Sequence, residues 1–91
     1  MANCKASTPT FHFDCRYSGR NVDKFVDYYA LQDIVNDKYS KGEVIEDKKH
    51  KGLEGPRYHV YINIHDKKVV VTIEKTKSCL KLITVWVENF R

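Results

Sequence analysis

The chain of 91 residues lacks the patterns that mark disulfide-rich, metal-binding or membrane-spanning domains. Its three cysteines, Cys4, Cys15 and Cys79, form no CxxC or Cys/His pattern, so we predict neither a disulfide scaffold nor a zinc site. No apolar run is long enough for a secretory signal or a membrane span. We therefore expect no metal, no cofactor and no membrane contact. The predicted compartment is a reducing cytoplasm, of a bacterium or of an infected host cell.

The composition predicts a folded domain with a basic surface. Hydrophobic residues make up 42% and charged residues 31% of the chain, a balance typical of a globular protein with a well-solvated exterior. Because this length allows only one core, we expect a flexible lead-in over residues 1–9 and a single domain over residues 10–91. A formal net charge of +4 and a pI near 9.0 favour encounters with polyanions, without proving a nucleic-acid partner.

Residues 58–65 alternate between apolar and polar side chains without a break. Successive side chains of a strand point to opposite faces, so Val60 and Ile62 are predicted to enter a core. His59 and Tyr61 are then expected on the opposite face. Both the predicted architecture and the predicted chemistry depend on this register.

Similar patterns predict the other elements. Residues 11–17 alternate and are expected to form a first strand, in which Cys15 is a small buried hydrophobe; Cys79 is expected to be buried in a later strand. Residues 21–39 have helical periodicity with two apolar faces. They form either one helix buried on two sides or two helices that break near residues 28–30. Further strands are predicted over residues 43–47, 69–75 and 80–87.

These elements predict an α+β fold in the order β-α(α)-β-β-β-β. One antiparallel sheet of four to five strands has one or two helices packed on one face, because each element has an apolar side to bury. The last strand is apolar on both sides, which places it in the middle of the sheet or against a partner. A homodimer through this last strand is compatible with every function considered below.

The histidines are the first candidates for chemistry. His59 and His65 lie on one strand face but about 20 Å apart, so they cannot act on the same bond. A working pair needs His59 together with His12 or His50, brought close by folding. An imidazole titrates near neutral pH, which suits a general acid or base. A solvated strand, however, also carries such residues without any catalytic role.

Cations and aromatic residues beside this strand form a second set of candidates. The predicted nucleic-acid contacts are Lys48, Lys49, Lys51 and Arg57, of which the lysines fall in a loop over residues 48–56. Tyr61 on the polar face is the candidate for stacking on a base, whereas Tyr58 and Trp86 are predicted to be core residues. A lysine-rich loop is also a common way to keep a surface soluble.

A helix, a basic loop and the strand segments at residues 42–46, 57–61, 69–73 and 82–86 follow one another in this chain. Over about residues 22–90 this order resembles the small toxin-type ribonucleases of the RelE/barnase-like group, in layout and strand texture. The resemblance implies a sheet under helices whose concave face cleaves RNA without a metal. It also implies catalytic positions at His59, Arg57, Tyr61 and Lys81. The chain departs from that group in its less basic helices.

Three functions follow as hypotheses. The first is a small basic intracellular protein acting on RNA as a metal-independent ribonuclease of toxin type. In this hypothesis His59 transfers protons, Arg57 and Lys81 hold phosphate, and Tyr61 stacks on or orients the base. The second is a small phage or viral protein that binds and inhibits a host enzyme. The third is a non-catalytic nucleic-acid-binding module. The expected partner is therefore RNA or another polyanion, or a host protein, and the residue pattern leaves open whether the chain is an enzyme.

Overall fold

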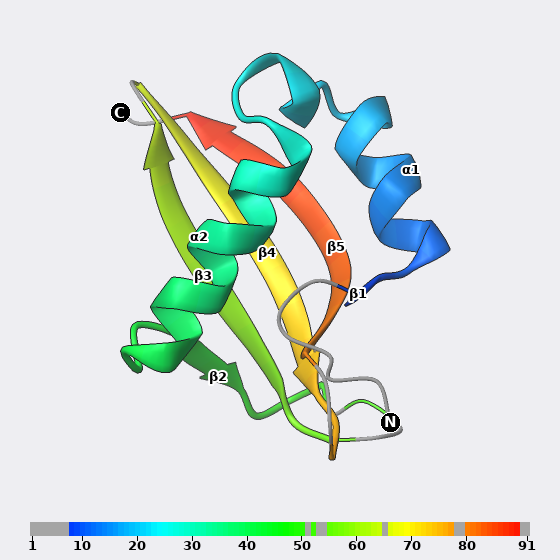
Figure 1. Ribbon diagram of the computed structural model, residues 1–91, viewed down its shortest axis with the longest axis vertical. Helices are drawn as coiled ribbons and strands as arrows, with labels where there is room; N and C mark the ends of the chain where they lie inside the picture. The colour runs from blue at the N-terminus through cyan, green and yellow to red at the C-terminus, as the bar shows by residue number, and fades with distance from the viewer. Residues whose placement is uncertain (1–7, 51, 53–54, 65, 78–79, 90–91) are drawn as a thin grey trace.

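The structure is a computed structural model that describes residues 8–50, 52, 55–64, 66–77 and 80–89 (Figure 1). Its elements are β1 (Thr8–Pro9), α1 (Phe11–Gly19), the 3-10 helix η1 (Val22–Lys24), α2 (Tyr28–Ser40), β2 (Ile45–Asp47), β3 (Arg57–Ile64), β4 (Lys67–Lys75) and β5 (Leu80–Asn89). The helices lie on one side of the sheet, with α2 across β3 and β4 and α1 beside β5 (Figure 1). Among the described residues, no helix is both long and apolar enough to cross a membrane.

The strands form one sheet in the order β1-β5-β4-β3-β2. Strands β2 to β5 pair antiparallel with their neighbours, and the two-residue β1 pairs in parallel with Lys81 and Leu82 of β5. The predicted α+β fold, an antiparallel sheet with helices on one face, is therefore confirmed. The four predicted strands that follow the helices all occur, with ends that lie within two residues of the predicted ones.

The predicted first strand over residues 11–17 is wrong, because these residues belong to α1. Thr10 begins the helix as its N-cap: its side-chain oxygen accepts a hydrogen bond from the backbone N–H of Phe13 at 3.2 Å. Residues two apart on a helix point to different sides, so Phe13 is fully buried whereas Cys15 is exposed. The predicted burial of Cys15 is therefore wrong as well, and Cys79 lies outside the described residues.

The helical segment predicted over residues 21–39 is divided, in agreement with one of the two predicted alternatives. The division lies slightly before the predicted break, because Asp27 is the N-cap of α2. The Asp27 carboxylate accepts hydrogen bonds from the backbone N–H groups of Tyr29 and Ala30 at 3.1 and 3.2 Å. An aspartate at this place ends the preceding turn and begins a new helix.

The core lies between the sheet and the helices. In β3, Val60 is fully buried and Ile62 is 4% exposed, and both belong to one cluster with Leu31 of α2. His59 and Tyr61 alternate with these residues and lie on the face opposite the helices. The predicted register of this strand is therefore confirmed over its described residues.

A β-bulge explains why β5 is apolar on both sides. The pairing of β4 with β5 shifts after Thr72, which leaves Ile83 as an extra residue on β5. Leu82 before the bulge and Val85 after it are both fully buried in the core, so the alternation changes phase at this point. Trp86 consequently lies on the face opposite the helices, and its predicted place in the core is wrong.

The outer edge of β5 is bound by residues of the same chain. The backbone N–H and the hydroxyl of Thr10 both donate to the carbonyl oxygen of Leu82, each at 3.0 Å. Arg20 Nη1 donates to the carbonyl oxygen of Val85 at 3.2 Å. The predicted central place of β5 is confirmed at its start, where it lies between β1 and β4. These contacts also occupy backbone carbonyls that an edge-to-edge dimer would need.

Candidate functional site

The face of the sheet opposite the helices carries the predicted site residues in four rows that run across β3, β4 and β5. The rows are Arg57–Glu74–Lys81, His59–Thr72–Thr84, Tyr61–Val70–Trp86 and Asn63–Lys68–Glu88. Ile45 and Asp47 of β2 extend this face beyond β3. We call these residues together the open face. Neighbouring strands are about 4.8 Å apart, so the side chains of one row can contact each other.

The row Tyr61–Val70–Trp86 is the apolar centre of the open face. Val70 is fully buried although it lies opposite the helices, with the two large aromatic residues as its neighbours on β3 and β5. Tyr61 is 36% exposed, and the Lys68 ammonium lies 5.4 Å from the centre of its ring. The Trp86 ring meets the imidazole of His59 edge-on, with 5.9 Å between the ring centres. The row therefore offers aromatic surface with a cation beside it.

His59 is hydrogen-bonded through both ring nitrogens. Nε2 lies 3.0 Å from Asp47 Oδ2, and Nδ1 lies 3.0 Å from the hydroxyl oxygen of Thr72. An ionised carboxylate only accepts hydrogen bonds, so His59 donates through Nε2 to Asp47, whereas the hydroxyl of Thr72 can either donate to Nδ1 or accept from it. The side chain of His59 is 22% exposed. The predicted proton-transfer residue is thus held in one orientation between β2 and β4.

Asp47, at the end of β2, accepts hydrogen bonds from both the turn that follows it and the neighbouring strand. Its Oδ1 accepts from the backbone N–H groups of Lys49 and His50 at 3.1 and 3.2 Å. Its Oδ2 lies 3.1 Å from His50 Nδ1 and 3.0 Å from His59 Nε2. Burial raises the pKa of this carboxyl, but the hydrogen bonds from His50, His59 and the Lys49 backbone outweigh burial and hold the pKa at about 2. Asp47 is therefore ionised at neutral pH.

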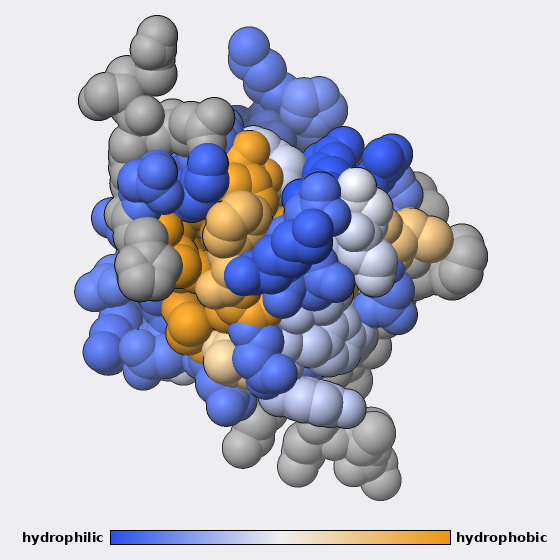
Figure 2. All heavy atoms as spheres, turned by 90° about the horizontal axis from the view of Figure 1, so that it is seen from above, coloured by the Kyte–Doolittle hydropathy of each residue, from blue (hydrophilic) through white to orange (hydrophobic). Residues whose placement is uncertain are grey.

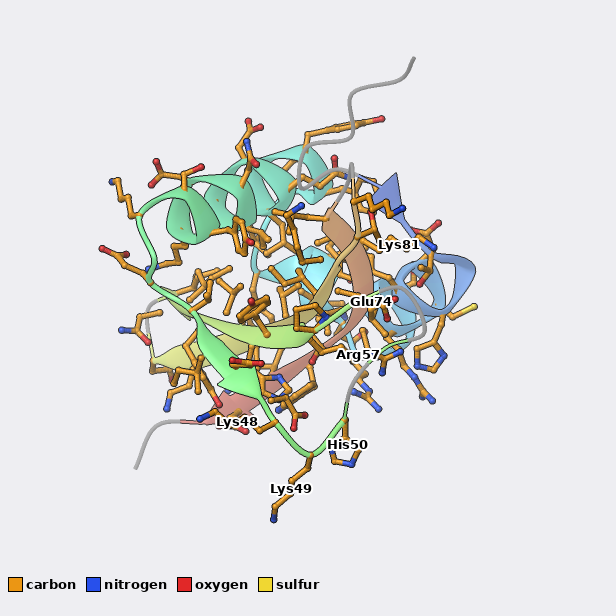
Figure 3. The ribbon with its side chains drawn as sticks, turned by 90° about the horizontal axis from the view of Figure 1, so that it is seen from below. Lys48, Lys49, His50, Arg57, Glu74 and Lys81 are labelled. Atoms are coloured by element: carbon orange, nitrogen blue, oxygen red, sulfur yellow. The ribbon has the colours of Figure 1, made fainter. Side chains whose placement is uncertain are left out.

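Arg57 forms an ion pair and is not a free phosphate clamp. Its Nε donates to Glu74 Oε1 at 3.1 Å, and the Glu74 side chain is only 5% exposed (Figure 3). Gly52 lies so close to the Glu74 carboxylate that a Cβ at this position would overlap it. In its row Glu74 stands between Arg57 and Lys81. A carboxylate thus separates the two cations that were predicted to hold phosphate.

The exposed cations of the site lie on the turn after β2, which we call the basic turn (residues 48–50). Lys48, Lys49 and His50 are exposed and point outward, away from the Arg57–Glu74 pair (Figure 3). Lys51, which was also predicted to bind nucleic acid, lies outside the described residues. The structure therefore separates the predicted cations into a paired set on the sheet and an exposed set on the turn.

Of the four histidines, folding brings His50 and His59 together on Asp47. His12 is not part of this arrangement, because it lies on α1, where its Nε2 accepts a hydrogen bond from Arg16 Nε at 3.3 Å. His65 lies outside the described residues. The predicted pairing of His59 with His50 is thus supported through a shared carboxylate, and the pairing with His12 is not.

Charges on the open face cancel. The cations Arg57, Lys68 and Lys81 are matched by the carboxylates of Asp47, Glu74 and Glu88. The excess positive charge beside this face therefore comes from Lys48 and Lys49 of the basic turn. Within the part of the chain that the structure describes, no group of three or more His, Cys, Asp or Glu residues is placed to hold a metal ion.

Reasoning from the sequence missed Asp47 and Glu74 as parts of this site. Glu74 lies opposite Arg57 because β3 ends at Ile64 and β4 begins at Lys67. The predicted strands over residues 58–65 and 69–75 leave a longer turn over residues 66–68, and this turn would move the pairing of Arg57 away from Glu74. The correct turn length would have revealed this partner, whereas Asp47 sits on a strand too short to give a clear pattern.

A second exposed surface lies at one end of the molecule. Figure 2 shows apolar surface gathered there in a patch with hydrophilic side chains around it. Phe25, the residue after η1, is 37% exposed, and the Lys67 ammonium lies 5.9 Å from the centre of its ring. The open face carries the predicted residues His59 and Tyr61 together with Trp86 and is therefore the stronger candidate for a functional site.

Comparisons with protein-family models, curated proteins and solved structures give no match to this chain. The resemblance to RelE/barnase-like ribonucleases therefore remains a prediction from the residue pattern. The proposals below are argued from the open face and the basic turn alone.

Proposed function

We propose that this protein binds single-stranded RNA along the open face. The observation that carries the proposal is the row Tyr61–Val70–Trp86, which places aromatic side chains on the face that the helices leave uncovered. Unpaired bases stack on such rings, and each stacked base contributes about 1–3 kcal/mol of binding free energy. In a duplex the bases stack on one another, so this surface favours single strands.

The arrangement of cations supports the same proposal. Lys68 of β4 lies beside one end of β3 and the basic turn beside the other end, with Tyr61 between them. A nucleic-acid strand laid along β3 meets the basic turn, Tyr61 and Lys68 in succession. Because the charges of the open face itself cancel, we expect few phosphate contacts and a slope of log K against log salt of about −2, near −0.7 per contact.

Fluorescence anisotropy with a short labelled single-stranded RNA tests the aromatic contact. Tyr61→Ala is expected to weaken binding about tenfold, because one stacking partner is lost. Tyr29→Ala is the matched control, since Tyr29 is 72% exposed on α2, in the helical layer. Equal affinities of the two variants, or no binding by the wild-type protein, would overturn the proposal.

The salt dependence of the same binding tests the basic turn. Lys48→Ala/Lys49→Ala is expected to reduce the slope by about 1.4, because two phosphate contacts are lost. Arg16→Ala/Lys24→Ala removes the same charge from exposed positions on α1 and η1 and is expected to leave the slope nearly unchanged. A slope that falls equally in both double variants would show that total charge, and not the turn, sets the affinity.

Metal-independent cleavage of the bound RNA is a second, narrower proposal, favoured by the Asp47–His59 contact. In it the ribose 2′-oxygen attacks phosphorus and the bond to the 5′-oxygen breaks, which leaves a cyclic phosphate and a free 5′-hydroxyl. His59 takes the proton of the 2′-hydroxyl and delivers it to the leaving 5′-oxygen, and Tyr61 orients the base. Arg57 and Lys81 hold the phosphate in this proposal only after Arg57 exchanges Glu74 for it. His59 must first release Thr72 or Asp47. RNA that stays intact with wild-type protein, or is cut equally by His59→Ala, contradicts this proposal.

The cancelled charges of the open face favour a protein partner as the alternative function, namely inhibition of a host enzyme by a small phage or viral protein. An interface of mixed charge with aromatic residues at its centre is typical of protein contacts. A stoichiometric complex with one host enzyme, lost in Tyr61→Ala and formed without RNA, would support this alternative over RNA binding.

A further inference from the structure

We propose that Asp47 is the positioning residue of the basic turn, holding Lys48, Lys49 and His50 in place beside the open face. The affinity part of this inference rests on the proposed RNA binding, whereas the order of the turn is a property of the protein alone. Asp47 connects the basic turn to the open face. Its Oδ1 holds the backbone of the turn, and its Oδ2 contacts the rings of His50 and His59.

The contacts form a continuous chain from the turn to the middle of the sheet. The N–H groups of Lys49 and His50 bind Asp47, Asp47 binds His59, and His59 binds Thr72 on β4. Thr72 is only 5% exposed, so the chain ends on a side chain that is held in the interior. A turn of exposed lysines is thereby attached to a buried side chain on the middle strand of the sheet.

The charge of Asp47 makes this role distinguishable from simple electrostatics. A carboxylate beside a phosphate-binding turn repels the ligand, so removing its charge alone predicts tighter RNA binding. If Asp47 positions the turn, losing its side chain instead frees the lysines, and binding becomes weaker because the turn must be ordered again on binding. The two explanations therefore predict changes in RNA affinity of opposite sign for the same substitution at Asp47.

Asp47→Ala and Asp47→Asn separate the two effects. Asparagine keeps an oxygen that accepts from the turn and lacks the charge, whereas alanine lacks both. In Asp47→Ala we expect hydrogen exchange at the Lys49 and His50 amides of the free protein to become about tenfold faster and RNA affinity to fall about three- to tenfold. In Asp47→Asn we expect protection to be kept and affinity to equal or exceed that of the wild type. Asp33→Ala, on the exposed side of α2, is the matched loss of a carboxylate and is expected to leave both readouts unchanged.

Tighter RNA binding by Asp47→Ala, or unchanged exchange at the two amides, would overturn the positioning role. If Asp47→Ala does not fold, weaker binding and faster exchange in Asp47→Asn would overturn it too, because the retained oxygen would then not hold the turn. Failure of the proposed function has a different signature: wild-type protein binds no RNA, while faster exchange in Asp47→Ala with protection restored in Asp47→Asn still supports the positioning of the turn.

Discussion

Arg57 and Glu74 face each other across β3 and β4, and Arg57 Nε lies 3.1 Å from Glu74 Oε1. The Glu74 side chain is 5% exposed and that of Arg57 is 32% exposed, so the arginine compensates a carboxylate that water hardly reaches. A buried charge that loses its partner is more costly than the pair was favourable. The first role of Arg57 is therefore in the stability of the sheet.

Arg57→Ala is expected to lower the free energy of unfolding by about 2–3 kcal/mol, because Glu74 is left without this partner. Glu74→Gln in addition should recover part of the loss, since the remaining side chain carries no charge. Urea unfolding of the single and double variants measures both values. Equal stability of the single and double variants would show that the pair is not coupled in this way.

Thr10→Val is expected to lower the free energy of unfolding by about 1–2 kcal/mol. The substitution keeps the shape of the side chain but removes the oxygen that accepts from Phe13 N–H and donates to the Leu82 carbonyl oxygen. Thr10→Ser retains the hydroxyl and should stay close to the wild type in the same unfolding experiment. A serine variant as unstable as the valine variant would locate the effect in the methyl group instead.

Gly55→Ala is expected to destabilise the protein by about 2 kcal/mol, because the new Cβ would overlap the backbone carbonyl oxygen of Lys75. Gly19→Ala is the control, since a Cβ on this last residue of α1 meets no atom within 4 Å. Thermal unfolding of both variants measures the difference. Similar loss at the two glycines would mean that the close approach at Gly55 does not determine the effect, since the lower chain entropy of alanine alone favours the folded state.

The stability that Asp47 contributes should disappear in acid. Its pKa in the folded protein is lowered to about 2, below the value of about 3.9 expected in the unfolded chain. A depressed pKa stabilises the fold above the unfolded value, and this contribution is lost as the pH falls through the folded value. The stability difference between wild type and Asp47→Asn should therefore be complete above about pH 5 and shrink between about pH 4 and pH 2. A difference that stays constant over this range in urea unfolding contradicts the assignment.

The sheet could be predicted from the sequence because β3 alternates between buried and less buried residues over its second half, and the period of two is then unambiguous at Val60 and Ile62. The strand prediction for residues 11–17 was wrong because a short segment with apolar residues two and four apart fits a strand as well as a helix. The signal that distinguishes the two is the N-cap at Thr10. The predicted burial of Trp86 was wrong because the apolar residues on both sides of this strand did not show where a bulge changes the phase, which the pairing with β4 decides.

The candidate site was predictable only as far as it depends on one strand. His59 and Tyr61 lie on the expected face because alternation along β3 decides it. Their partners Asp47 and Thr72 come from other strands, and which residue lies opposite which is set by turn lengths that the pattern did not determine. The pairing of β3 with β4 therefore placed Glu74 opposite Arg57, and the alternation along one strand could not show that this arginine forms an ion pair.

The extra residue at Ile83 lets a single strand serve two surfaces. Were Ile83 paired regularly with Thr72 instead, β5 would keep a single phase from end to end, the indole of Trp86 would turn toward the helices, and Val85 and Val87 would turn to the opposite face. The aromatic surface proposed to meet RNA thus depends on where a backbone irregularity of one amino acid falls, whereas loss of Ile83 itself would leave a regular strand with the same two faces.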